Sequence, residues 1–415
     1  MTSLRQPWTW IFGNTHRPAT AALALTLALT VIPTHTAYAQ QWTLHVLHNF
    51  TDGTDGALPL AGLTIDRGGN LYGSANVGGS IGAGTVYNLK RSGSNFSFNL
   101  LYSFNGSEDG AGPQARVIFG PNGSLYGTTT GGGPDGHGVV FNLRPPPTAC
   151  RTVICPWSEA MIYRFTGGAD GNQPETGDVA FDAAGNLYGT TAHGGDSSGD
   201  GVAYKLTLSH GTWTESDLFE FAGSGSVPYS GMSSDGHGNW FGTTTAGGAG
   251  FGTVYELTPA GSGWMEQPIY TFLNGNDGRF PTGGLIIDQS GDLYGTTSTG
   301  GHNGAGTVFK LTFAHGTWNI DVLFSFAGSA GPSGSLTMDA AGNLYGITAQ
   351  NDPHIFGEVF QLTPSGTYND LYDFQAGNDG AFPQGGVVMD SSGNLYGTAE
   401  LGGANGKGTV WELEP

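Results

Sequence analysis

The chain has 415 residues, a formal net charge of −20 and 74 glycines. So acidic a chain is a poor partner for nucleic acids and anionic membrane surfaces, which bind proteins through Lys and Arg. Aromatic residues make up 12% of the chain and no collagen period occurs, so short aromatic strands joined by glycine-rich turns are favoured over fibrous or disordered classes.

The first 39 residues have the order of a secretory signal peptide. Arg5 and Arg17 precede an apolar run over residues 21–32, and a small-residue cleavage site follows at Ala37-Tyr38-Ala39. The apolar run is too short to span a bilayer comfortably as a mature helix. We therefore predict cleavage after residue 39 and a secreted or periplasmic protein without stable membrane insertion; an uncleaved amino-terminal anchor is the alternative.

An element of the form Asp-x-x-Gly-Asn-Leu-Tyr-Gly recurs along the rest of the chain. Its aromatic position is occupied by Tyr72, Tyr126, Tyr188, Phe241, Tyr294, Tyr345 and Tyr396. Each repeat unit contains four short runs rich in β-branched and aromatic residues, separated by Gly and Asp turns and without helical periodicity. We therefore predict an all-β domain over residues 40–415, a seven-bladed β-propeller of four-stranded antiparallel blades.

The two cysteines, Cys150 and Cys155, lie in a proline-containing insertion at about residues 144–158. In an oxidising compartment so close a pair predicts a local disulfide that pins the insertion. A metal site is not expected there, because two cysteines do not complete a tetrahedral shell and no nearby Cys or His pair adds to them.

The two ends of the domain favour a closed ring over an open solenoid, which would need distinct capping repeats. Residues 44–50 have the pattern of a fourth strand without its other three, and residues 409–413 that of a third strand without a fourth. We expect these two segments to pair, which completes the last blade and leaves no open sheet edge.

The pattern Asn-Leu-Tyr-Gly-Thr-Thr, followed by Gly-Gly and by Gly-x-Gly-Thr-Val-Phe-x-Leu, resembles the GloVer (choice-of-anchor) tandem repeat of bacterial exported proteins. It is also loosely similar to NHL and streptogramin-lyase propellers. The resemblance covers essentially the whole mature chain and implies architecture and export without implying an activity. Members of that family carry varied carboxy-terminal anchors, whereas this chain ends at Glu414-Pro415 directly after a predicted strand; this departure favours secretion or periplasmic residence and leaves surface anchoring open.

Two recurrent loops of each unit are expected on one face of the ring. The loop before the first strand carries Asp-Gly-x-x-Pro in five units, with the aspartates Asp55, Asp109, Asp170, Asp277 and Asp379. As a functional feature, they would form a ring of carboxylates at the channel mouth for a cationic or sugar ligand or for Ca²⁺, the one cofactor considered. As a structural feature, they are Asp-Gly turns fixed by proline.

The loop between the second and third strands carries the histidines His137, His193, His302 and His354. Beside carboxylates, an imidazole can act as a general base, for example next to a uronic carboxylate, or as a metal ligand. The alternative is that they are polar loop residues in solvent. No H-E-x-x-H, G-x-S-x-G or Walker-type motif occurs, so no catalytic or metal-binding residue is assigned.

Three functions remain open. The leading hypothesis is a non-catalytic exported module that binds an extracellular glycan, peptide or surface partner. The alternatives are a polysaccharide lyase or hydrolase with a His/Asp site at the channel mouth, and a structural or adhesive surface protein. The acidic charge fits plain solubility or a cationic partner, and the oligomeric state is not predicted. A localised site requires one asymmetric cluster, whereas a scaffold requires none.

Overall fold

The computed structural model describes residues 42–146, 157–175, 177–195, 198–223, 225–328, 331–350 and 355–415. All the described residues belong to one compact unit, residues 40–415. The predicted signal peptide, the predicted disulfide between Cys150 and Cys155, and His354 lie outside the described residues. Every regular element in the described residues is a β-strand, and none of them forms a helix long and apolar enough to cross a membrane.

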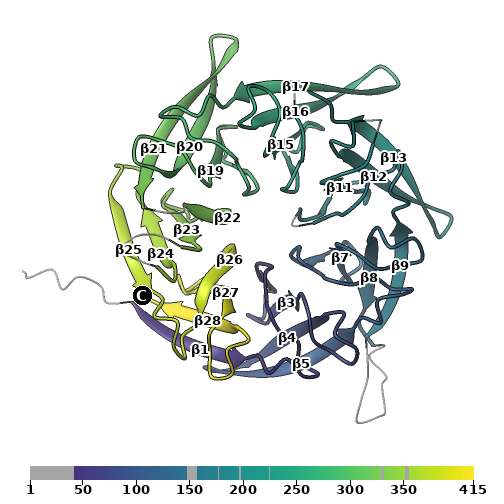
Figure 1. Ribbon diagram of the computed structural model, residues 1–415, viewed down its shortest axis with the longest axis vertical. Helices are drawn as coiled ribbons and strands as arrows, with labels where there is room; N and C mark the ends of the chain where they lie inside the picture. Colours follow the sequence, from purple (N-terminus) through teal and green to yellow (C-terminus); the bar gives the residue numbers. More distant parts are fainter. Residues whose placement is uncertain are drawn as a thin grey trace, which may run out of the picture. The chain divides into compact units, whose positions relative to one another are not determined.

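Five sheets contain four antiparallel strands each, and within each sheet the strands follow in chain order outward from the middle of a ring (Figure 1). The first two sheets consist of β2 (Thr64–Ile65), β3 (Leu71–Ala75), β4 (Thr85–Ser92) and β5 (Asn95–Ser103), and of β6 (Ile118–Phe119), β7 (Leu125–Thr129), β8 (Val139–Arg144) and β9 (Ser158–Arg164). The next three consist of β10 (Ala180–Phe181), β11 (Leu187–Thr191), β12 (Val202–Ser209) and β13 (Thr212–Glu220); of β14 (Ser233–Ser234), β15 (Trp240–Thr244), β16 (Thr253–Ala260) and β17 (Gly263–Thr271); and of β18 (Ile286–Ile287), β19 (Leu293–Thr297), β20 (Gly304–Ala314) and β21 (Thr317–Ala327).

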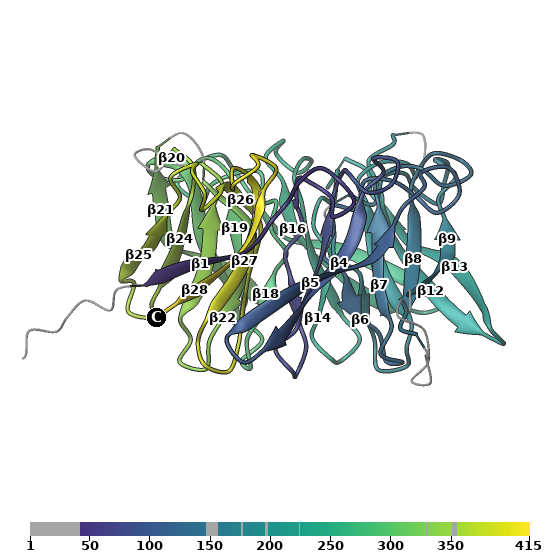
Figure 2. The same cartoon turned by 90° about the horizontal axis from the view of Figure 1, so that it is seen from below.

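The sixth sheet has eight strands in the order β1-β28-β27-β26-β22-β23-β24-β25. Its strands are β1 (Thr43–Asn49), β22 (Pro332–Met338), β23 (Leu344–Thr348), β24 (Glu358–Leu362), β25 (Tyr368–Asp373), β26 (Ala381–Met389), β27 (Leu395–Leu401) and β28 (Thr409–Glu414). Seen from the side, the strands of the domain run between two rims of loops (Figure 2). The all-β propeller predicted from the repeat is therefore confirmed.

The predicted count of seven separate four-stranded blades is not met, because the strand pairing gives five such sheets and one sheet of eight strands. The two halves of the large sheet are joined through one parallel residue pair, Ser335 and Gly386. Glycine permits this contact. A Cβ on Gly334 would lie 2.4 Å from the backbone nitrogen of Gly386, and one on Gly386 would lie 2.4 Å from the carbonyl oxygen of Ser335. Bare backbone lets β22 and β26 approach closely enough to pair.

The predicted pairing of the first and last strands is confirmed. β1 and β28 are antiparallel, with Leu44 opposite Leu413 and Asn49 opposite Thr409, and Figure 1 shows them side by side. The amide of Phe50 continues the contact by donating to the carbonyl of Gly408 at 3.1 Å. The edge of β28 is thereby covered by a strand from the other end of the domain.

Buried aromatic rings fill the spaces between neighbouring sheets. The Leu-Tyr-Gly tyrosine of β7, Tyr126, is 96% buried and meets Phe181 of β10 edge-on with ring centroids 4.9 Å apart. Trp213 of β13 lies 6.2 Å from the same ring. Because such contacts recur from sheet to sheet, the repeated tyrosine serves packing.

The repeated proline also has a packing role. A Cβ on Gly84 would lie 2.5 Å from Cδ of Pro113, the proline of the following unit, and one on Gly408 would lie 2.5 Å from Cδ of Pro59. Each of these glycines has a positive φ and precedes the third strand of its unit. Each proline therefore packs against a glycine of the neighbouring unit, where a side chain would not fit. The contact between Pro59 and Gly408 lies at the junction of the first and last units.

Candidate functional site

The five predicted aspartates lie in tight loops whose groups they bind internally. Asp109 is 96% buried and accepts hydrogen bonds from Tyr102 Oη at 2.6 Å and from the amides of Asn105 and Gly106 at 2.9 and 3.1 Å. The other four accept bonds of the same kind from a backbone amide and from the aromatic ring seven residues earlier, namely Asp55, Asp170, Asp277 and Asp379. These contacts are the ones expected if the aspartates stabilise turns. Ligand binding by the five aspartates stays a prediction.

The aromatic residue that precedes each of these loops varies together with the aspartate. Where the aspartate is present the ring has a polar atom, as in Tyr163, Tyr270 and Tyr372. In the two units that lack the aspartate, Phe219 and Phe324 occupy this place. Burial and the nearby Asp379 raise the pKa of Tyr372 to about 12, so the tyrosine remains a hydrogen-bond donor to the carboxylate at neutral pH.

The three described histidines come from different units and do not form one cluster. Nδ1 of His137 lies 3.1 Å from Oδ1 of Asn172, and the backbone of Asn172 pairs in turn with that of His193. His193 and His302 are exposed. In the part of the chain that the structure describes, the group of carboxylates or imidazoles close enough to share a metal ion is Glu358, Asp370 and Asp373, which includes none of the predicted residues.

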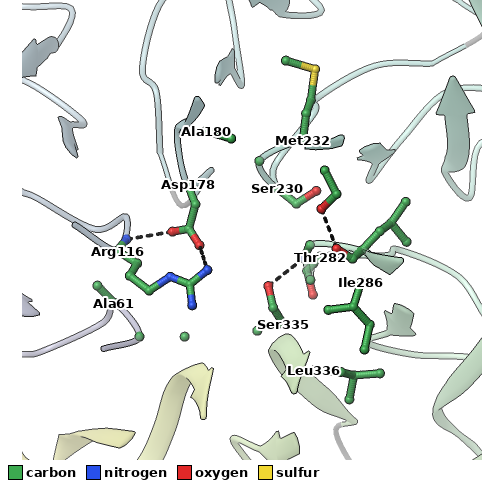
Figure 3. Close-up of a pocket in the computed structure, with 18 of the residues that line it drawn as sticks. Ala61, Arg116, Asp178, Ala180, Ser230, Met232, Thr282, Ile286, Ser335 and Leu336 are labelled. Atoms are coloured by element: carbon green, nitrogen blue, oxygen red, sulfur yellow. Dashed lines mark hydrogen bonds and ion pairs between the residues drawn. The ribbon is translucent and has the colours of Figure 1, made fainter. Parts of the chain in front are cut away.

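The strongest candidate site is a cavity of about 880 Å³ along the centre of the ring. It is lined mainly by the innermost strands and by the residues just before them, and Figure 3 shows its side chains converging from several sheets. A volume of this size lies within the usual range for small-molecule sites.

The cavity wall carries charged residues at one position of the repeat. In the five four-stranded sheets, the residue two positions before the innermost strand is Gly62, Arg116, Asp178, Gly231 and Gly284. Arg116 and Asp178 are also the two charged side chains among the described residues that line the cavity. Asp178 reaches this position because its unit has one residue more between Pro174 and the strand than the other units have.

Arg116 and Asp178 bind each other by two hydrogen bonds across neighbouring sheets. The guanidinium Nη2 donates to Asp178 Oδ2 at 2.7 Å, and the Arg116 amide donates to Asp178 Oδ1 at 2.9 Å. Their side chains remain 34% and 27% exposed, so the cavity reaches both. In Figure 3 another amino group of Arg116 points toward the open middle.

The rest of the wall combines uncharged polar side chains with apolar ones. Gln114, Ser333 and Gln384 line it together with Tyr229, while Met232 and Ile286 supply aliphatic surface (Figure 3). Burial and hydrogen bonding to Glu175 raise the pKa of Tyr229, which keeps the hydroxyl protonated.

A second feature that sequence patterns do not reveal is a set of half-buried glutamates on the outer strands of three consecutive sheets. Burial, followed by Asp109, raises the pKa of Glu159 to about 7. Burial, Asp217 and Asp170 raise that of Glu215 to about 8, and burial raises that of Glu266 to about 7. One oxygen of each carboxylate is buried without a hydrogen-bond partner in the described residues, which explains why the charged form is disfavoured.

The family described as the Gloeobacter/Verrucomicrobia repeat matches residues 34–195 and 174–411. No curated protein matches the chain. Among solved structures, the extracellular domain of a one-component system from B. thetaiotaomicron is similar, with 13% identity over 89% of this chain and 40% of that one and a TM-score of 0.54. The chain thus spans about 40% of the length of that relative. A gluconolactonase from Xanthomonas campestris shares 14% identity over 92% of this chain and 93% of its own, with a TM-score of 0.44.

Proposed function

The chain belongs to the Gloeobacter/Verrucomicrobia repeat family, and on that premise we propose that it is an exported, non-catalytic module that binds an extracellular ligand in its central cavity. The observation that carries the proposal is the break in the repeat at Arg116 and Asp178. A scaffold would keep glycine at this position in every unit, whereas a binding site needs one place that differs from the rest.

Binding is favoured over catalysis by the placement of the groups that could transfer protons. His137, His193 and His302 lie in loops of different units, and His137 faces an amide rather than a carboxylate. The predicted aspartates are engaged by amides and aromatic hydroxyls of their own loops. Neither group is part of the cavity wall.

Export and the blade count belong to the same proposal. Export is supported by the signal-peptide order of residues 1–39, and in an oxidising compartment Cys150 and Cys155 would form a local disulfide. We count the eight-stranded sheet as two blades, which makes a seven-bladed ring. This count is supported by the single residue pair that joins its halves and by seven buried clusters that lie between successive units.

The test is a binding screen of the mature protein, residues 40–415, with saccharides and short peptides. Thr282 lines the cavity (Figure 3), so Thr282→Trp should fill part of it and weaken binding of any true ligand at least about tenfold. Ser94→Trp places the same ring in an exposed hairpin turn and should leave binding unchanged. Equal binding by both variants would refute the cavity as the site, and conversion of a bound compound to product would show an enzyme instead.

A further inference from the structure

We infer that the ligand of the central cavity is an uncharged saccharide whose neighbouring hydroxyl groups bind the Arg116–Asp178 pair. This inference rests on the proposed function and adds the chemical class of the ligand. It follows from the charge balance of the cavity wall, from the hydrogen-bonding capacity left on the pair and from the way the pair is held.

The charge balance favours a neutral ligand. Arg116 and Asp178 carry opposite charges, and the described residues lining the cavity include no other Asp, Glu, Lys or Arg. An anion placed beside the guanidinium would also lie beside the Asp178 carboxylate. A cation placed beside the carboxylate would also lie beside the Arg116 guanidinium. Either ligand would lose part of its hydration and meet a like charge. A neutral molecule avoids this cost.

The remaining hydrogen-bonding capacity of the pair matches hydroxyl groups. Each oxygen of Asp178 accepts one bond from Arg116, at 2.7 and 2.9 Å, and each retains another lone pair. The amino group of Arg116 that points into the cavity (Figure 3) has no hydrogen-bond partner among the described residues. A hydroxyl both donates and accepts, so two adjacent hydroxyls can accept from the guanidinium and donate to the carboxylate together.

The pair is held in place before a ligand arrives. Arg116 and Asp178 are 62 positions apart in sequence, and both the amide and the guanidinium of Arg116 contact the carboxylate, at 2.9 and 2.7 Å. Two contacts fix the carboxylate plane and restrict the arginine, so binding loses less side-chain entropy. Gly231 and Gly284, at the equivalent positions of two other units, line the cavity without a side chain.

The surrounding wall fits the same class of ligand. Tyr229 is half-buried beside the cavity, and its ring offers an apolar surface on which the C–H face of a sugar can rest. Gln114 and Gln384 are amides that can donate and accept. The wall therefore combines one aromatic surface with uncharged polar groups around a single neutral ion pair.

The experiment is calorimetric titration of the mature protein with glucose and cellobiose, and with glucuronate and glucosamine as charged counterparts of glucose. Glucose or cellobiose should bind at least about tenfold more tightly than either charged sugar. Tighter binding of glucuronate or glucosamine would overturn the inference but leave the proposed function standing. If Thr282→Trp weakens none of the ligands that bind, the proposed function itself fails.

Asp178→Asn gives a second readout that does not depend on loss of binding. Asparagine keeps the oxygen that accepts from the Arg116 amide and removes the negative charge. The preference should move toward glucuronate by about tenfold, because an unbalanced guanidinium then faces the cavity. A preference that stays the same would refute the role of the pair.

The matched control is Arg91→Gln. It removes an ion pair of similar length, Arg91 Nη1 to Asp390 Oδ2 at 3.1 Å, from a junction outside the cavity. Glucose affinity and sugar preference should both remain unchanged in this variant. Arg91→Gln removes a positive charge, so a change of equal size in the opposite direction would show that the selectivity comes from overall charge and would contradict the inference.

Discussion

Phe50 provides a direct test of ring closure. It follows β1, is fully buried, and packs with Leu63, Leu71 and Tyr87 of the first sheet and with Val410 of β28. The Phe50 and Tyr87 ring centroids are 5.3 Å apart. Phe50→Ala removes this ring from a site that exists because β1 lies against the last strand.

The expected loss in the free energy of unfolding is about 3–5 kcal/mol, the usual range for a buried phenylalanine replaced by alanine. Phe221 holds the equivalent place inside the ring, is 99% buried and lies 5.0 Å from Tyr255, so Phe221→Ala should cost the same. Leu208→Ala, at a side chain that is 51% exposed, should change the stability by less than about 0.5 kcal/mol.

The assay is urea unfolding of the mature protein, followed by tryptophan fluorescence. A loss for Phe50→Ala that resembles the value for Leu208→Ala would mean that residues 43–50 are not packed against the last strand in solution. That result would refute the reasoning on closure, because a free arm would leave the ring of Phe50 in water.

Two further predictions concern the loops and the outer strands. Asp170→Ala should destabilise the protein by about 1–3 kcal/mol, because Tyr163 and a backbone amide lose their acceptor. Adding Tyr163→Phe should cost less than an independent change, because a unit that lacks the aspartate has Phe219 in the place of Tyr163; a double-mutant cycle with no coupling would contradict this. Burial and neighbouring carboxylates raise the pKa of Glu215 from 4.5 to about 8, so its contribution to stability is complete below about pH 4.5 and declines as the pH rises through about 8. Unfolding at pH 6 and pH 9 should show this decline, and Glu215→Gln should reduce it; an undiminished decline in that variant would assign the effect to other groups.

Much of the fold was predictable because each repeat unit contains short sequence patterns that specify its turns and strands. The Asp-x-x-Gly-Asn turns predict tight turns, and Asp182 does accept from the amides of Ala184 and Asn186, both at 2.9 Å. The unpaired patterns at residues 44–50 and 409–413 predicted the closing pair. The eight-stranded sheet was not predictable, because it depends on how closely the backbones at Gly334 and Gly386 approach.

The candidate site was harder to predict, because a search for recurring motifs selects residues that repeat in every unit and passes over residues that differ in one or two of them. The recurrent aspartates proved to be engaged in their own loops, whereas Arg116 and Asp178 are visible in sequence as departures from glycine. Asp178 stands two positions before its strand in a unit that has one residue more after Pro174 than the other four-stranded units. Sequence comparison of the units could have revealed the extra residue, but not the contact of 2.7 Å.

The pairing of β1 with β28 also limits the order in which the molecule can fold. Asn49 accepts a hydrogen bond from Ala404, 355 positions along the chain, so the closing contacts have the longest loops to order. The sheets between them can form through contacts that are local in sequence, whereas β1 cannot pair until β28 has formed. Until then two strand edges stay uncovered, and that interval is when joining to another chain competes with completion of the ring.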